Sequence, residues 1–126
     1  MAQVSYESAP VSVRDDLVQA HEQVWTKLAE PGTWWTSAER IAIAAETRNA
    51  RQCALCRERK AALSPMAVQG QHDSDNILSE VVIDVVHRMT TDPGRCSQEW
   101  YETLADEGVA DAHYVEALGI VARTIS

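Results

Sequence analysis

The sequence predicts an all-α fold, and three observations support this prediction. Phe does not occur in the chain, β-branched residues do not alternate with polar residues, and the turn residues are spaced for helices rather than for hairpins. The chain has 126 residues, of which 45% are hydrophobic, so it is long enough to bury a core of its own. We therefore expect residues 1–126 to form a single helical domain of about five to six helices.

The N-terminal helix is expected over residues 13–29. Its apolar residues recur at intervals of three and four and define one face, which comprises Leu17, Ala20, Val24, Trp25 and Leu28. Pro31 and Gly32 follow this pattern and end the helix.

A helical segment that carries two cysteines is expected over residues 37–63. Thr36 and Glu39 have the spacing of a capping box, so this segment begins near Ser37. Small and aliphatic side chains form its expected buried side, namely Ile41, Ala44 and Ala45.

Asn49 is the expected interruption of this segment. A second helix that restarts there would place Cys53 in its first turn or just after it. Unpaired backbone N–H groups at a helix N-terminus stabilise a nearby thiolate, so this restart favours a reactive thiol.

Three C-terminal helices are expected over residues 75–125. Asp73 or Ser74 can cap the first of them, which has an apolar face and carries His87 near its end. Ser97 caps the second, and the third continues apolar almost to the chain terminus.

The pair Cys53 and Cys56 is the strongest functional signal in the chain. Two residues three apart lie on one face of a helix, so a disulfide needs little backbone adjustment. Four of the 11 basic residues lie within ten positions around the pair: Arg51, Arg57, Arg59 and Lys60. Because cations favour the thiolate, which is the reactive form, thiol–disulfide chemistry is the leading hypothesis.

Zinc binding and core packing are alternative interpretations of the pair. His72 and His87 could complete a Cys-x2-Cys-x15-His-x14-His set, but structural zinc fingers place their histidines three to five residues apart. Buried cysteines can also act as small hydrophobic residues, although this gives the flanking arginines no role. The third cysteine, Cys96, is expected to be a bystander.

Charge and hydropathy exclude several classes of partner. Acidic residues outnumber basic ones by 19 to 11 and the calculated pI is near 4.8, whereas nucleic-acid-binding domains usually present a basic face. No stretch approaches the roughly 18 apolar residues of a membrane span, and the first ten residues lack the features of a signal peptide. We expect a cytoplasmic protein that binds neither nucleic acid nor membrane.

The segment Ala38-Glu39-Arg40-Ile41-Ala42-Ile43-Ala44, followed by the Cys-x2-Cys pair, resembles the AhpD-like alkylhydroperoxidase branch of the carboxymuconolactone decarboxylase family. The resemblance is best over residues 34–63. It implies an all-helical protein that forms a homo-oligomer and needs no metal or organic cofactor. It further implies that Cys56 attacks a hydroperoxide substrate, that Cys53 resolves the sulfenic acid as a disulfide, and that a thiol or dithiol partner reduces the disulfide.

The family motif also contains a proton relay, formed by an upstream glutamate and a histidine four residues after the second cysteine. Lys60 occupies the position of that histidine, and Glu39 lies 14 residues before Cys53, about two more than usual. We expect Glu39 and His87 to manage protons, with Glu46 as a weaker substitute for the glutamate. The alternative is a non-catalytic helical subunit or binding module in which the relay has decayed.

Overall fold

The computed structural model describes residues 5–125, and within this range it contains six α-helices, two short 3-10 helices and no strand. The α-helices are α1 (Asp15–Leu28), α2 (Ser37–Ala50), α3 (Ala54–Ala61), α4 (Glu80–Thr91), α5 (Gln98–Asp106) and α6 (Asp111–Ile125), and the 3-10 helices are η1 (Pro65–Ala67) and η2 (Pro93–Arg95). The predicted all-α class and the predicted number of helices are confirmed. No helix in the described part of the chain is both long enough and apolar enough to cross a membrane.

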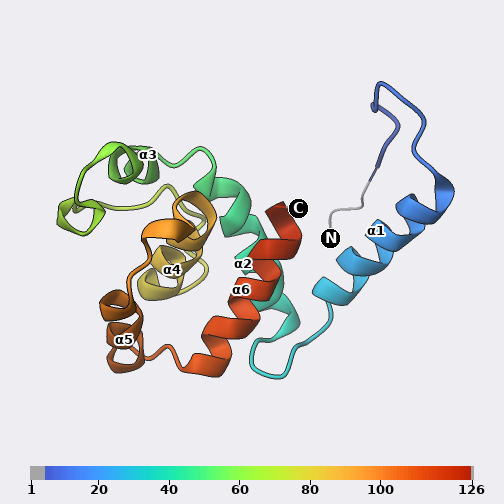
Figure 1. Cartoon of the computed structure of the whole chain (residues 1–126). Helices are drawn as coiled ribbons and strands as arrows, with labels where there is room; N and C mark the ends of the chain where they lie inside the picture. Colours follow the sequence, from blue (N-terminus) through green and yellow to red (C-terminus); the bar gives the residue numbers. More distant parts are fainter. Residues whose placement is uncertain (1–4, 126) are drawn as a thin grey trace.

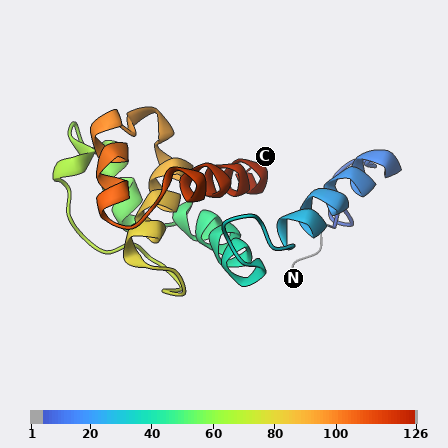
Figure 2. The same ribbon diagram turned by 90° about the horizontal axis from the view of Figure 1, so that it is seen from below.

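Helices α2, α4 and α6 pack against one another and form the centre of the molecule (Figure 1). Helices α3 and α5 lie on the side of this centre that faces away from α1. Helix α1 stands apart from the other helices in both views and approaches them only through its C-terminal end (Figures 1 and 2).

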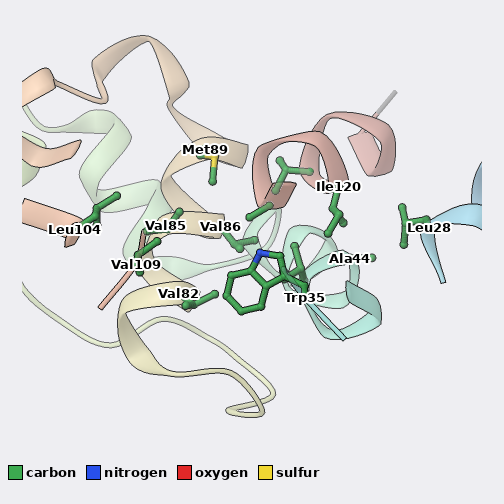
Figure 3. Close-up of a cluster of buried hydrophobic side chains, with 13 residues drawn as sticks. Leu28, Trp35, Ala44, Val82, Val85, Val86, Met89, Leu104, Val109 and Ile120 are labelled. Atoms are coloured by element: carbon green, nitrogen blue, oxygen red, sulfur yellow. The ribbon is translucent and has the colours of Figure 1, made fainter. Parts of the chain in front are cut away.

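The core between the three central helices is mainly aliphatic. Figure 3 shows the indole of Trp35 among side chains of α4 and α6, and its Nε1–H donates to the His113 carbonyl at 2.9 Å. Burying one aliphatic side chain stabilises the fold by about 1.5–3 kcal/mol, so this cluster fixes α4 against α2 and α6. Its buried members are Leu28, Trp35, Ile43, Ala44, Val82, Val85, Val86, Met89, Leu104, Val109, Ala117, Ile120 and Val121.

The apolar face predicted for the first helix is mostly uncovered. Leu28 in the last turn is 2% exposed, whereas Leu17 is 47% exposed and Val24 is 39% exposed. Only the last turn of α1 reaches the core, because the rest of the helix projects from it (Figure 1). Hydrophobic periodicity predicts that a helix has an apolar face, but it does not say what covers that face.

The start of α2 is confirmed, whereas part of its predicted buried side is wrong. The Thr36 side chain accepts from the Glu39 N–H, and Glu39 accepts from the Thr36 N–H, which completes the capping box. Ile41, expected to be buried, is 41% exposed, and Ile43 takes the core position. The same helix also buries three polar side chains, each with a hydrogen-bond partner inside the protein: Arg40, Glu46 and Thr47.

The helix boundaries around the cysteines also differ from the prediction. Asn49 lies inside α2, and the restart falls four residues later, so that Cys53 is the N-cap of α3. Helix α4 begins at Glu80 and is capped by Ser79 rather than by Asp73 or Ser74. Segment 69–78, which precedes it and forms no helix or strand, supplies polar groups to the cysteine site.

Candidate dithiol site

The two cysteines lie at the start of α3. Cys53 has an extended backbone (φ −74°, ψ 125°) as N-cap, and Cys56 is the third residue of the helix. Both thiols are free and buried, with residue exposures of 0% for Cys53 and 4% for Cys56. They form a small cluster with Leu55 and Val68, separate from the main core. These apolar surroundings keep bulk water away from the sulfur atoms.

His87 connects Cys56 to a buried carboxylate. Its Nδ1 lies 3.4 Å from the Cys56 Sγ, and its Nε2 lies 2.9 Å from Glu46 Oε1. Because an ionised carboxylate only accepts hydrogen bonds, the hydrogen on His87 sits on Nε2, which leaves the Nδ1 lone pair facing the thiol. Both His87 and Glu46 are at most 1% exposed, so the chain Cys56–His87–Glu46 is enclosed by protein.

Segment 69–78 holds the Glu46 carboxylate in place. Ser74 donates its hydroxyl to Glu46 Oε2 at 2.7 Å, and the Asp75 N–H donates to the same oxygen at 3.0 Å. Asp73, one residue earlier, accepts the Ala54 N–H at 3.0 Å and so caps the start of α3. The polar residues that predicted an earlier start for α4 therefore bind Glu46 and α3 instead.

A second histidine faces both thiols. The Nδ1 of His72 lies 3.5 Å from the Cys53 Sγ and 3.6 Å from the Cys56 Sγ, and its Nε2 lies 2.8 Å from Asp84 Oδ1. The rings of His72 and His87 are adjacent, with their centroids 4.2 Å apart. Each imidazole thus presents Nδ1 to the sulfur atoms and Nε2 to its own carboxylate.

Asp84 also binds two arginines. Arg59 Nη1 lies 2.7 Å from Asp84 Oδ1, and Arg88 Nε lies 2.8 Å from Asp84 Oδ2. Arg59 is itself buried, and its Nε donates to the Val68 carbonyl. This arrangement fixes the carboxylate against His72 and balances its charge.

The two histidines have opposite pKa shifts. Burial alone lowers the pKa of His72, but the Asp84 carboxylate and then the two cysteines raise it to about 10. Burial lowers the pKa of His87, and the nearby His72 adds to this effect, while Glu46 opposes it only in part. His72 is therefore a cation at neutral pH, and His87 is a neutral base.

Opposing effects also act on the acidic groups. Burial raises the pKa of Cys53, but hydrogen bonds from the backbone N–H groups of Cys56 and Asp73 and from His72 bring it below its ordinary value. Burial likewise raises the pKa of Glu46, and the bonds from His87, Ser74 and Asp75 more than offset this effect. Both shifts favour the charged form of the group, which is the thiolate at Cys53 and the carboxylate at Glu46.

Two spaces of different size lie next to the site, a small cavity and a larger cleft. A cavity of about 20 Å³, enough for roughly one water molecule, borders Cys56 and His72. A larger cleft of about 550 Å³ borders the outer side of His72 and is also lined by Arg59, Asp84 and Trp100. Cys56 borders the small cavity, whereas Cys53 lines neither of these two spaces.

The structure brings together three of the four predicted catalytic residues. Cys53, Cys56 and His87 meet, but Glu39 serves the capping box at the other end of α2, about three turns or roughly 16 Å from Ala50. Glu46, predicted only as a weaker substitute, lies in the position expected of Glu39. The sequence pattern did not reveal that the Glu46 carboxylate, on the same helix α2, is buried.

The basic residues around the cysteines act differently from the prediction. Arg51, Arg57 and Lys60 are exposed, and only Arg59 is buried, where it binds Asp84 rather than a thiol. The positive charge next to the sulfur atoms comes from His72. From the sequence, His72 was predicted only as an alternative zinc ligand, and Asp84 was assigned no role. The presence of two histidines in a chain with few of them was the available signal.

Comparisons of the chain with family models, with curated proteins and with solved structures found no match. The resemblance to AhpD-like proteins stays a prediction made from the residues. Function is therefore inferred from the geometry of the site itself.

Proposed function

We propose that this protein is a Cys-x2-Cys thiol peroxidase that reduces hydroperoxides, with Cys56 as the attacking thiol and Cys53 as the resolving thiol. The observation that supports this function best is the buried chain from Cys56 through His87 to Glu46, with contacts of 3.4 Å and 2.9 Å. A thiol, a base and a residue that orients the base form the arrangement by which proteins activate cysteine nucleophiles.

In the first step, His87 Nδ1 takes the proton from the Cys56 thiol. The thiolate attacks one oxygen of the hydroperoxide, an S–O bond forms, and the O–O bond breaks. The leaving alkoxide takes the proton back from His87 and departs as an alcohol. Cys56 is oxidised to the sulfenic acid, and Glu46 stabilises the transient imidazolium.

In the second step, the Cys53 thiolate attacks the Sγ of Cys56. An S–S bond forms, the S–O bond breaks, and the hydroxide takes a proton from the neighbouring imidazolium of His72 to leave as water. A dithiol partner then supplies two electrons and two protons, which returns Cys56 to the thiol, Cys53 to the thiolate and His72 to the imidazolium, and leaves the partner as a disulfide.

Exposure and charge favour this assignment of the two thiols. Cys56 borders the small cavity and is 4% exposed, whereas Cys53 is 0% exposed, so a substrate meets Cys56 first. The pKa of Cys53 is lowered, in part by the His72 contact, and this shift favours the thiolate that the second step needs.

We also propose that the protein resides in a reducing compartment and forms a homo-oligomer. Free thiols persist in the cytoplasm, where we place the protein. Apolar side chains on two helices remain exposed, and a second copy of the chain could cover them: Leu17 and Val24 on α1, and Val115, Leu118 and Ile125 on α6. Native mass spectrometry of the full chain measures this assembly.

Peroxide consumption with dithiothreitol as electron donor tests the proposed activity. Wild-type protein should consume hydrogen peroxide or an alkyl hydroperoxide, and Cys56→Ser should abolish turnover. Cys96→Ser is the matched control, because Cys96 lies outside the cluster of the two cysteines and two histidines and its thiol donates to the Asp92 carbonyl, and it should retain turnover. A wild-type protein that consumes no hydroperoxide would leave an assembly subunit as the better interpretation.

A further inference from the structure

We propose that the reduced site binds one Zn²⁺ ion, with the Sγ atoms of Cys53 and Cys56 and the Nδ1 atoms of His72 and His87 as its four ligands. These four donor atoms come from the start of α3, from segment 69–78 and from α4, and all lie within 4.8 Å of one another. The site needs only these donors and does not depend on peroxide reduction.

The distances between the donors fit a tetrahedral ion. With Zn–S near 2.3 Å and Zn–N near 2.0–2.1 Å, a sulfur and a nitrogen on one tetrahedron lie roughly 3.6 Å apart. The His72 Nδ1 lies 3.5 Å and 3.6 Å from the two sulfur atoms, and the His87 Nδ1 lies 3.4 Å from the Cys56 Sγ. The donor atoms that lie farthest apart would have to approach each other by roughly an ångström to reach tetrahedral spacing.

The outer contacts of both histidines support a metal site. Histidines that bind a metal through one ring nitrogen almost always donate the other N–H to a carboxylate, a carbonyl or water. Here His72 Nε2 faces Asp84 at 2.8 Å, and His87 Nε2 faces Glu46 at 2.9 Å. Two independent carboxylates thus hold both rings with Nδ1 directed at the sulfur atoms.

The donor set identifies the metal. Two thiolates and two imidazoles in a tetrahedron are a ligand set typical of structural zinc, whereas calcium and magnesium require oxygen ligands. Four protein ligands leave no open position, so the bound ion would close the site. The histidine spacing differs from that of zinc fingers because each histidine reaches the thiols from a different segment of the chain.

Zinc and the disulfide compete for the same sulfur atoms. A thiolate bound to zinc cannot form the Cys53–Cys56 bond until the ion leaves, so zinc should slow oxidation of the pair. The peroxide reaction, in turn, should release the ion: the two bound thiolates give two electrons, and ROOH with two protons becomes ROH and water. Zinc would then be held only while the thiols are reduced.

Titration of the reduced full-length protein with ZnCl₂ against a chromophoric chelator tests the proposal. One ion per chain is expected, and Cys53→Ser, Cys56→Ser, His72→Gln and His87→Gln should each weaken binding at least tenfold. Cys96→Ser is the matched control and should bind as wild type does. Circular dichroism of each variant shows whether it is folded, and a loss of binding counts only in a folded variant.

Substitution of CoCl₂ for zinc examines the ligands without any mutation. Intense visible absorption from tetrahedral cobalt, together with a thiolate-to-cobalt charge-transfer band, is expected from the wild-type protein. Absence of binding at one equivalent, or a cobalt spectrum without the thiolate band, would overturn the proposal. Peroxide consumption by metal-free protein is measured separately, so that zinc binding without turnover, or turnover without zinc binding, identifies which of the two proposals fails.

Discussion

The Nδ1 of His87 lies 3.4 Å from the Sγ of Cys56, although the two residues are 31 positions apart in the chain. The contact arises because α3 and α4 pack against each other and α4 buries His87 completely. Helix α2 brings Glu46 to the other side of the ring. Packing of three helices, rather than a local motif, therefore builds the base that faces the thiol.

Replacing His87 tests this relationship. His87→Gln keeps a polar side chain of similar size next to Glu46 but removes the base, so the rate of Cys56 oxidation by hydroperoxide should fall by roughly 10²–10⁴-fold. Stopped-flow measurement of the single-turnover rate under metal-free conditions checks this expectation. His113→Gln on α6 is a control for the loss of a histidine elsewhere, and its rate should equal that of wild type.

Glu46 and Glu39 form a matched pair on one helix. Glu46→Gln should slow Cys56 oxidation, because a neutral amide stabilises the His87 imidazolium less, and it should lower the free energy of unfolding by roughly 1–3 kcal/mol through its buried contacts. Glu39→Gln should change neither quantity, because glutamine also serves a capping box. Single-turnover kinetics and urea unfolding compare the two variants. Equal rates for both would remove Glu46 from the relay.

Local patterns in the sequence predicted the helices and the cysteine pair. The capping box at Thr36 and Glu39 and the Ser97 cap are local signals, and the structure confirms both. The role of Glu39 could not be judged from its spacing, because one carboxylate cannot fill a cap and reach the end of the same helix. Long-range contacts decide such cases, and a sequence pattern does not contain them.

The charged part of the site was harder to predict for the same reason. Arg59 was expected to act on the thiols directly, but it binds Asp84, which in turn binds His72. The exposed positions of Arg51 and Lys60 show that a local excess of basic residues does not mean that each of them faces the cysteines. Burial and tertiary packing determine which charges act on a thiol.

The pKa values of the two histidines should be shifted in opposite directions in reduced, metal-free protein. His72, with a pKa of about 10, should stay protonated through neutral pH, whereas His87 should lose its proton below pH 6.5. Because the pKa of His72 is raised in the fold, its contribution to stability is complete below about pH 6.5 and is lost as the pH rises through about 10. NMR titration of the imidazole resonances measures both values.

Asp84→Asn is the control for the histidine titration. The Asp84 carboxylate is the largest influence that raises the pKa of His72, so its loss should bring that pKa back toward 6.5. The pKa of Cys53 should rise in this variant, because a neutral His72 stabilises a thiolate less. An unchanged His72 titration in a folded Asp84→Asn protein would contradict the described electrostatics.

Mass spectrometry of reduced, metal-free protein after one equivalent of hydroperoxide tests the central claim most directly. The account predicts loss of two hydrogen atoms from the intact chain and a single Cys53–Cys56 disulfide in the peptide map, with Cys96 still alkylatable; Cys53→Ser should instead accumulate a sulfenic acid at Cys56. Unreacted Cys53 and Cys56 thiols, or oxidation confined to Cys96, would contradict it.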